Sequence, residues 1–145
     1  MSQRQISNDR RGELVRAAIE ALATANAVQP ANLRFGAAVL TQSGNVYTSS
    51  VFWSATSTLL LHAEHAALAH AASHGERDVV AVACVSTEDP DGRRYCHPCG
   101  ICRQLIYESA QASKIDVEVL MGNMRGEHVS KRVSELVPYP WPPSE

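Results

Sequence analysis

The first half of the chain alternates between a helical pattern and short apolar runs. From the possible N-caps at Ser7-Asn8-Asp9, apolar residues recur at helical spacing, which predicts an amphipathic helix ending near Ala27. Pro30 then breaks the pattern. The apolar run Phe35–Leu40, the turn residues at 43–45 and the run Val46–Val51 predict a β-hairpin, and the small residues of its first strand leave room for a close neighbour.

The second half continues the alternation of helices and strands. An alanine-rich helix is expected from about Leu60 to Ser73, and the continuous apolar run Val79–Val85 predicts a strand covered on both faces. The remaining expected elements are a helix from the cysteines to about Ala112, a strand at 115–120, a short edge strand at 127–130, at most a short helix at 134–136, and an extended proline-rich tail at 138–145 whose aromatic side chains pack on something.

This order predicts one α/β domain spanning residues 1–145, with helices on the faces of a sheet. The helix that begins at the cysteines would connect parallel neighbours. Both stretches that carry candidate metal ligands then lie at helix N-termini, where the backbone N–H groups and the helix dipole favour thiolate.

Composition narrows the class of protein. Hydrophobic residues make up 45% and charged residues 19%, with a net charge of −2, as in ordinary globular enzymes. The scattered basic residues give no nucleic-acid surface, and no segment resembles a signal peptide or membrane span. Four cysteines, three of them clustered, are typical of metal ligands in a reducing compartment, so we expect a cytoplasmic protein.

The candidate chemistry lies in two motifs. Cys99 and Cys102 are spaced to share the first turn of a helix, and His62 is the best candidate for a third ligand. Three protein ligands leave a fourth zinc position open, as in catalytic sites. Glu64, two residues after His62, is well placed to exchange protons with a metal-bound water.

Other interpretations of the cysteines stay open. A thioredoxin-type redox pair would need different residues around the thiols, and an iron–sulfur cluster would need a fourth cysteine near Cys102. A closed structural zinc site with Cys96 or His97 as fourth ligand is a stronger rival, but leaves Glu64 unexplained. Arg103 is either a donor to the metal ligands or an exposed helix residue.

The motifs His62-Ala63-Glu64 and Pro98-Cys99-Gly100-Ile101-Cys102-Arg103-Gln104 resemble those of the cytidine deaminase family. The resemblance implies a three-layer α-β-α fold with a mixed sheet of about five strands. It also implies Zn²⁺ held by His62, Cys99 and Cys102, Glu64 as the proton shuttle, and hydrolytic release of ammonia. The backbone N–H of Ala63 and the carbonyl of His97 are expected to contact the pyrimidine.

The chain departs from the family where ribose is bound. The asparagine and glutamate that hold the sugar hydroxyls in nucleoside deaminases correspond to Val51 and Trp53, and a family phenylalanine corresponds to Leu33. An apolar wall would leave sugar hydroxyls unpaired. We therefore expect an amino-heterocycle or a modified cytosine nucleoside as substrate, with a blasticidin S-like compound as one candidate. Packing in the core or between subunits is the alternative role for Phe52 and Trp53.

Short family members assemble as tetramers, so the resemblance also implies a homotetramer in which Tyr139 and Trp141 reach a neighbour's pocket, or else hold the tail on their own domain.

Three possible functions place different requirements on the sequence. A zinc aminohydrolase depends on Glu64, whereas a zinc-stabilised binding protein that has lost catalysis does not. A polynucleotide-editing deaminase needs a basic groove, which this sequence lacks.

Overall fold

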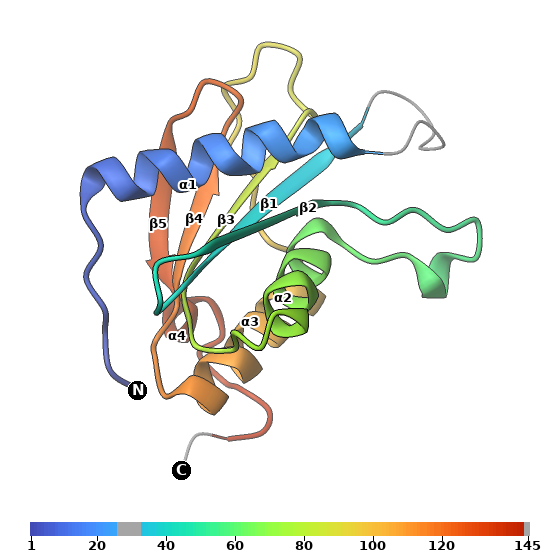
Figure 1. The fold of residues 1–145 in the computed structure, drawn as a ribbon. Helices are drawn as coiled ribbons and strands as arrows, with labels where there is room; N and C mark the ends of the chain where they lie inside the picture. The colour runs from blue at the N-terminus through green and yellow to red at the C-terminus, as the bar shows by residue number, and fades with distance from the viewer. Residues whose placement is uncertain (26–32, 144–145) are drawn as a thin grey trace.

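A computed structural model describes residues 1–25 and 33–143 and shows a mixed sheet with helices on both faces (Figure 1). The helices are α1 (Asn8–Ala21), α2 (Ala63–Ser73), α3 (Gly100–Ser113) and α4 (Val133–Leu136), with short 3₁₀ turns η1 (Leu22–Thr24) and η2 (Ser57–Leu59). The strands are β1 (Phe35–Thr41), β2 (Val46–Ser50), β3 (Val79–Ser86), β4 (Glu118–Gly122) and β5 (His128–Arg132). None of the helices in these two ranges has the length and apolarity needed to cross a bilayer.

The five strands lie in the order β2-β1-β3-β4-β5. The predicted hairpin is present as the antiparallel pair β1 and β2. Strands β3 and β4 are parallel, and α3 is the crossover between them, as predicted. All eight residues of β3 are buried, which explains its continuous apolar sequence.

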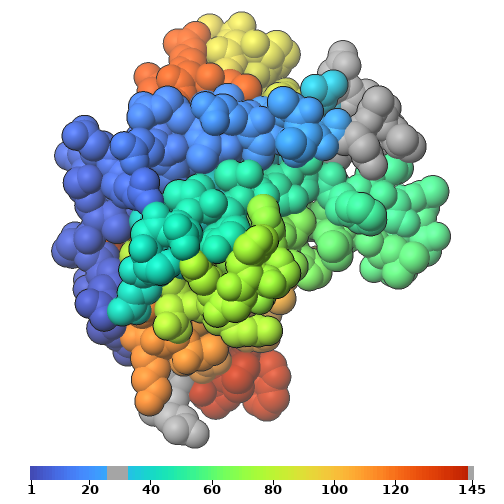
Figure 2. Space-filling view, in the orientation of Figure 1, coloured from blue at the N-terminus to red at the C-terminus, as the bar shows by residue number. Residues whose placement is uncertain are grey.

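The two faces of the sheet have separate cores, so the expected three-layer arrangement is confirmed. Side chains from alternate positions of the strands pack with α1 on one face and with α2 and α3 on the other. In β1, for example, Ala38 and Leu40 belong to the first core, whereas Ala37 and Val39 belong to the second. The segment between β2 and α2 projects from this body, in green at the right of Figure 2.

Close packing of α1 explains the small residues in β1. A Cβ atom at Gly36 would lie 2.2 Å from the backbone oxygen of Ala18 in α1. No side chain can occupy that space, so the helix approaches the strand more closely than any other residue would allow. The expectation that something would approach this strand closely is met by α1.

Several predicted boundaries differ from the structure. The first helix ends at Ala21 and continues only as a 3₁₀ turn to Thr24, while Ala27 and Pro30 lie outside the described residues. The helix predicted from Leu60 begins at Ala63, because Leu61 forms an antiparallel bridge with Phe52. The strand predicted from residue 115 begins at Glu118, and the edge strand runs from His128 to Arg132.

The proline-rich tail lies along α3, but its aromatic side chains do not pack on this chain. Gln104 donates to the backbone oxygen of Trp141, and the Tyr107 hydroxyl donates to that of Pro142 at 3.1 Å. Tyr139 is nevertheless 95% exposed and Trp141 77% exposed. Of the two predicted roles of these aromatics, the structure does not support the one in which they hold the tail on their own domain, because backbone oxygens make the attachment.

Candidate active site

Two helix N-termini bring the candidate metal ligands together. His62 is the N-cap residue of α2, Cys99 is the N-cap of α3, and Cys102 lies in the first turn of α3. The Nδ1 atom of His62 lies 3.2 Å from the Cys99 sulfur and 3.5 Å from the Cys102 sulfur. In the described part of the chain, these three residues alone form a group of metal-ligating side chains whose ligand atoms all lie within 4.8 Å of one another.

The spacing of these atoms fits zinc. With Zn–S and Zn–N bonds of their usual lengths, tetrahedral geometry places sulfur and nitrogen ligands roughly 3.6 Å apart. The two distances to His62 Nδ1 are close to this value. One imidazole and two thiols are also ligands that zinc commonly takes, and three protein ligands leave the fourth position for a reactant.

Glu64 lies beside this group, in the first turn of α2, with only 6% of its surface exposed. Burial raises the pKa of the Cys102 thiol well above its ordinary range, and the Glu64 carboxylate and Cys99 add to this effect. The direction is opposite to the helix-dipole effect expected from the sequence, because desolvation of a buried thiolate is the larger cost. A bound dication would reverse that cost, which is a further reason why these residues suit a metal.

Hydrogen bonds fix the loop that delivers Cys99. The backbone N–H of Cys96 donates to Gly122 O at 2.9 Å, and the buried Cys84 thiol donates to Cys96 O at 3.3 Å. Arg103 Nε donates to Pro98 O at 2.9 Å, directly before Cys99. Arg103 therefore bonds to the backbone of the ligand loop, which neither of its two predicted roles described.

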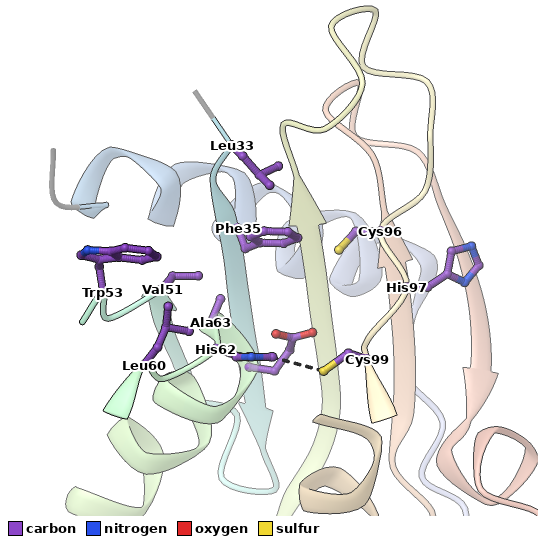
Figure 3. Close-up of a pocket in the computed structure, with 11 residues that line it drawn as sticks. Leu33, Phe35, Val51, Trp53, Leu60, His62, Ala63, Cys96, His97 and Cys99 are labelled. Carbon is purple, nitrogen blue, oxygen red and sulfur yellow. Dashed lines mark hydrogen bonds between the residues drawn. The ribbon is translucent and has the colours of Figure 1, made fainter. Parts of the chain in front are cut away.

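A cavity of about 310 Å³ opens next to the three candidate ligands (Figure 3). Eight of the residues predicted for catalysis, metal binding or substrate binding line this cavity: Leu33, Val51, Trp53, His62, Ala63, Glu64, His97 and Cys99. Cys102 is fully buried. The predicted trans residues Tyr139 and Trp141 are absent from the lining within this chain.

Three lining residues were not predicted as substrate contacts: Phe35, Leu60 and Cys96. Phe35 belongs to the predicted hairpin and Leu60 to a predicted helix, and an apolar residue in either element is most simply a core residue. The sequence feature that could have identified Phe35 and Leu60 is their spacing of two residues from predicted site residues, because residues two apart in an extended segment face the same way. Phe35 stands in this relation to Leu33, and Leu60 to His62.

The positions of Cys96 and His97 test the alternative prediction of a closed structural zinc site. Neither Cys96 nor His97 belongs to the group of clustered ligands found among the described residues. The His97 side chain points away from the other lining residues in Figure 3, so its backbone faces the cavity side of the loop. An open three-ligand site beside a buried carboxylate is the arrangement of hydrolytic zinc enzymes.

Comparison with known proteins also indicates a hydrolytic zinc enzyme. Residues 9–118 match the cytidine and deoxycytidylate deaminase zinc-binding region. A cytidine deaminase from Halalkalibacterium halodurans is 38% identical over 125 residues, covering 86% of this chain and 89% of the relative. A blasticidin-S deaminase from Bacillus cereus is 30% identical over 107 residues, covering 71% of this chain and 73% of the relative.

Solved structures agree as well. The crystal structure of cytidine deaminase from Burkholderia pseudomallei superposes with a TM-score of 0.77 at 29% identity, and the match covers 94% of this chain and 100% of the other. Fold and site thus define a zinc-dependent hydrolytic deaminase. The chain belongs to the cytidine and deoxycytidylate deaminase family.

Proposed function

We propose that the cavity converts an amino-pyrimidine or a cytosine-type nucleoside or base to its keto form, with zinc held by His62, Cys99 and Cys102 and with Glu64 as the proton carrier. The observation that carries this proposal is the position of Glu64. Its carboxylate is buried, lies two residues from His62, and lines the same cavity as His62 and Cys99. A buried carboxylate that lines the cavity is placed to exchange protons with a reactant bound there.

Zinc, when bound, supplies a Lewis acid that makes water nucleophilic near neutral pH. Glu64 accepts a proton from the attacking water and delivers it to the adjacent ring nitrogen while the new C–O bond forms at the amino-bearing carbon. Glu64 then moves the second water proton to the amine. The C–N bond breaks, ammonia leaves, and the carbonyl remains, so one water is consumed for each ammonia released.

Two backbone groups can orient the heterocycle. Ala63 is the first residue of α2, so its N–H has no acceptor within the helix and is available to a ring oxygen. His97 also lines the cavity, and its backbone carbonyl can accept from the exocyclic amine. A donor and an acceptor placed in this way match the edge of a cytosine-type ring.

The wall formed by Val51 and Trp53 supports a substrate other than an ordinary cytidine. Both residues line the cavity, and neither offers a carboxylate or amide to sugar hydroxyls. A second candidate substrate is a nucleoside antibiotic of the blasticidin S type. The specific observation in its favour is the blasticidin-S deaminase from Bacillus cereus among the relatives.

We extend the proposal to assembly and location. Exposed Tyr139 and Trp141 are available to a neighbouring subunit, which supports the homotetramer implied by the family. All four cysteines are free thiols, which supports a reducing cytoplasmic environment. Light scattering combined with size exclusion measures the assembly directly, and a monomer would contradict it.

Ammonia release from a panel of amino-heterocycles by zinc-loaded protein tests the proposed chemistry. Glu64→Gln should lower kcat/KM by at least about 1,000-fold while zinc content, measured by mass spectrometry, stays near one per chain. Glu108→Gln, the same change on the exposed face of α3, is the matched control and should not alter turnover. Turnover by Glu64→Gln within tenfold of the parent would contradict the role of Glu64, and silence of the zinc-loaded parent would favour a non-catalytic binding protein.

A further inference from the structure

The cavity wall away from the metal ligands consists of apolar side chains. Figure 3 shows Val51, Trp53 and Leu60 gathered on one side, with Cys96 and Cys99 on the other. Resting on the proposed function, we infer that the heterocycle accepted here carries an apolar, planar substituent, such as a benzyl or phenyl group, at the ring position where a nucleoside carries its sugar.

A backbone bridge explains why this wall is preformed. Phe52 N donates to Leu61 O at 3.0 Å, and Leu61 N donates to Phe52 O at 3.0 Å. Side chains alternate along paired extended segments, so the residues on either side of the bridge face the same way. The flanking residues Val51, Trp53, Leu60 and His62 all line the cavity, whereas the Phe52 side chain is turned outward and 63% exposed.

The same bridge ties the wall to the catalytic centre. His62, a candidate metal ligand, directly follows Leu61, so the bridge sets the position of Val51 and Trp53 relative to the reacting carbon. A heterocycle oriented by the Ala63 N–H and Glu64 would therefore project its substituent toward this wall. The substituent meets surface that is held in place by the backbone and need not be ordered on binding.

The chemistry of the wall selects the substituent. Trp53, Val51 and Leu60 offer apolar surface, and the Trp53 indole nitrogen lies at the end of its ring remote from His62 (Figure 3). Sugar hydroxyls buried against such a wall lose their hydrogen bonds with water, which weakens binding by roughly tenfold or more for each. An aromatic group would stack against Trp53 and Phe35 instead, and both rings line the cavity.

Kinetics with N1-benzylcytosine, cytosine and cytidine test this inference. The kcat/KM for ammonia release from N1-benzylcytosine should exceed that for cytidine by at least about tenfold. Trp53→Glu should reduce this ratio by at least about tenfold, whereas Trp53→Phe should keep it. Phe52→Ala is the matched control, because Phe52 lies between the two wall residues in sequence but outside the cavity, and it should leave the ratio unchanged.

Ligand-binding measurements test this inference independently of the proposed reaction. Calorimetry with N1-benzylpyrimidin-2-one and the pyrimidin-2-one ribonucleoside, which have no amine to lose, measures the preference of the wall without turnover. Tighter binding of the benzyl compound supports the inference even if no amine is released, in which case the proposed reaction alone fails. Equal or tighter binding of the ribonucleoside, or an equal shift in Phe52→Ala and Trp53→Glu, would overturn the inference.

Discussion

Replacing Gly36 by alanine should destabilise the fold, because the added methyl group has no room between β1 and α1. An ideal Cβ atom at this position would lie 2.2 Å from Ala18 O, 3.3 Å from Ala18 C and 3.3 Å from Leu22 Cδ2. The closest of these atoms belongs to the helix backbone, which cannot rotate away as a side chain could. The whole helix must therefore move outward by about 1 Å to restore an ordinary contact.

The cost follows from what that movement separates. Leu14, Val15 and Ala18 of α1 are fully buried against the sheet. A gap of 0.5–1 Å removes roughly a quarter to a half of the dispersion energy of each of their contacts with the sheet. Overpacking of this kind typically costs about 1–3 kcal/mol, and a backbone clash belongs at the upper end. The entropy that alanine saves relative to glycine offsets about 0.5–1 kcal/mol. We expect a net loss of about 2 kcal/mol, which corresponds to a fall in Tm of about 4–8 °C.

Gly12→Ala provides a matched control of opposite sign. Gly12 lies inside α1, where a Cβ atom would meet only Arg16 Nη1 at 3.6 Å, an ordinary contact. The same substitution should therefore stabilise the fold by about 0.5–1 kcal/mol through helix propensity. Equilibrium urea unfolding of both variants at saturating zinc measures the difference. A loss below about 0.5 kcal/mol in Gly36→Ala, or changes of the same sign in both variants, would refute the reasoning.

Three further predictions follow from charges and ligands. Glu76 accepts hydrogen bonds from Thr41, Ser43 and Asn45, and these bonds lower its pKa from 4.5 to about 2. Its stabilising contribution should be complete above pH 4.5 and be lost as pH falls toward 2, so the Tm deficit of Glu76→Gln should narrow over that interval and a constant deficit would contradict this account. Arg11 pairs with the buried Glu118 carboxylate at 2.7 Å, so Arg11→Met should cost about 2–4 kcal/mol in urea unfolding. Arg93→Met, which breaks the solvent-exposed pair with Asp91, should cost less than about 1 kcal/mol, and equal losses would be inconsistent with burial as the cause. Cys102→Ser should abolish zinc binding measured by mass spectrometry while Cys96→Ser retains it, and zinc loss in Cys96→Ser would revive the closed structural site.

The secondary structure could be predicted because its determinants are local. Hydrophobic periodicity and the residues typical of turns and helix caps predicted every helix and strand in the right order, from the apolar stripe of α1 to the buried run of β3. Boundaries failed where a partner distant in sequence competed with local propensity. Leu60 to His62 reads as the start of a helix, but the bridge to Phe52 keeps Leu61 extended, and α2 begins only at Ala63.

The metal ligands and Glu64 could be proposed from sequence for the same reason. Cys99 and Cys102 are related by one turn of α3, and His62 and Glu64 by the first turn of α2, so their spacing is set by helix geometry alone. What the spacing does not determine is that the two helix N-termini meet. That depends on the sheet order, which places β1 beside β3 and brings the segments that follow β2 and β3 to one edge.

Only the tertiary structure decided the rest of the pocket. Phe35, Leu60 and Cys96 come from three separate segments, and each carries a side chain that a core would also accept. The exposure of Tyr139 and Trp141 could likewise not be predicted from the sequence, because backbone oxygens rather than aromatic rings hold the tail on α3. Local sequence therefore determined which residues can bind a metal and carry a proton, whereas the wall that faces the substrate was set by long-range pairing of backbone groups, which every residue type except proline can make.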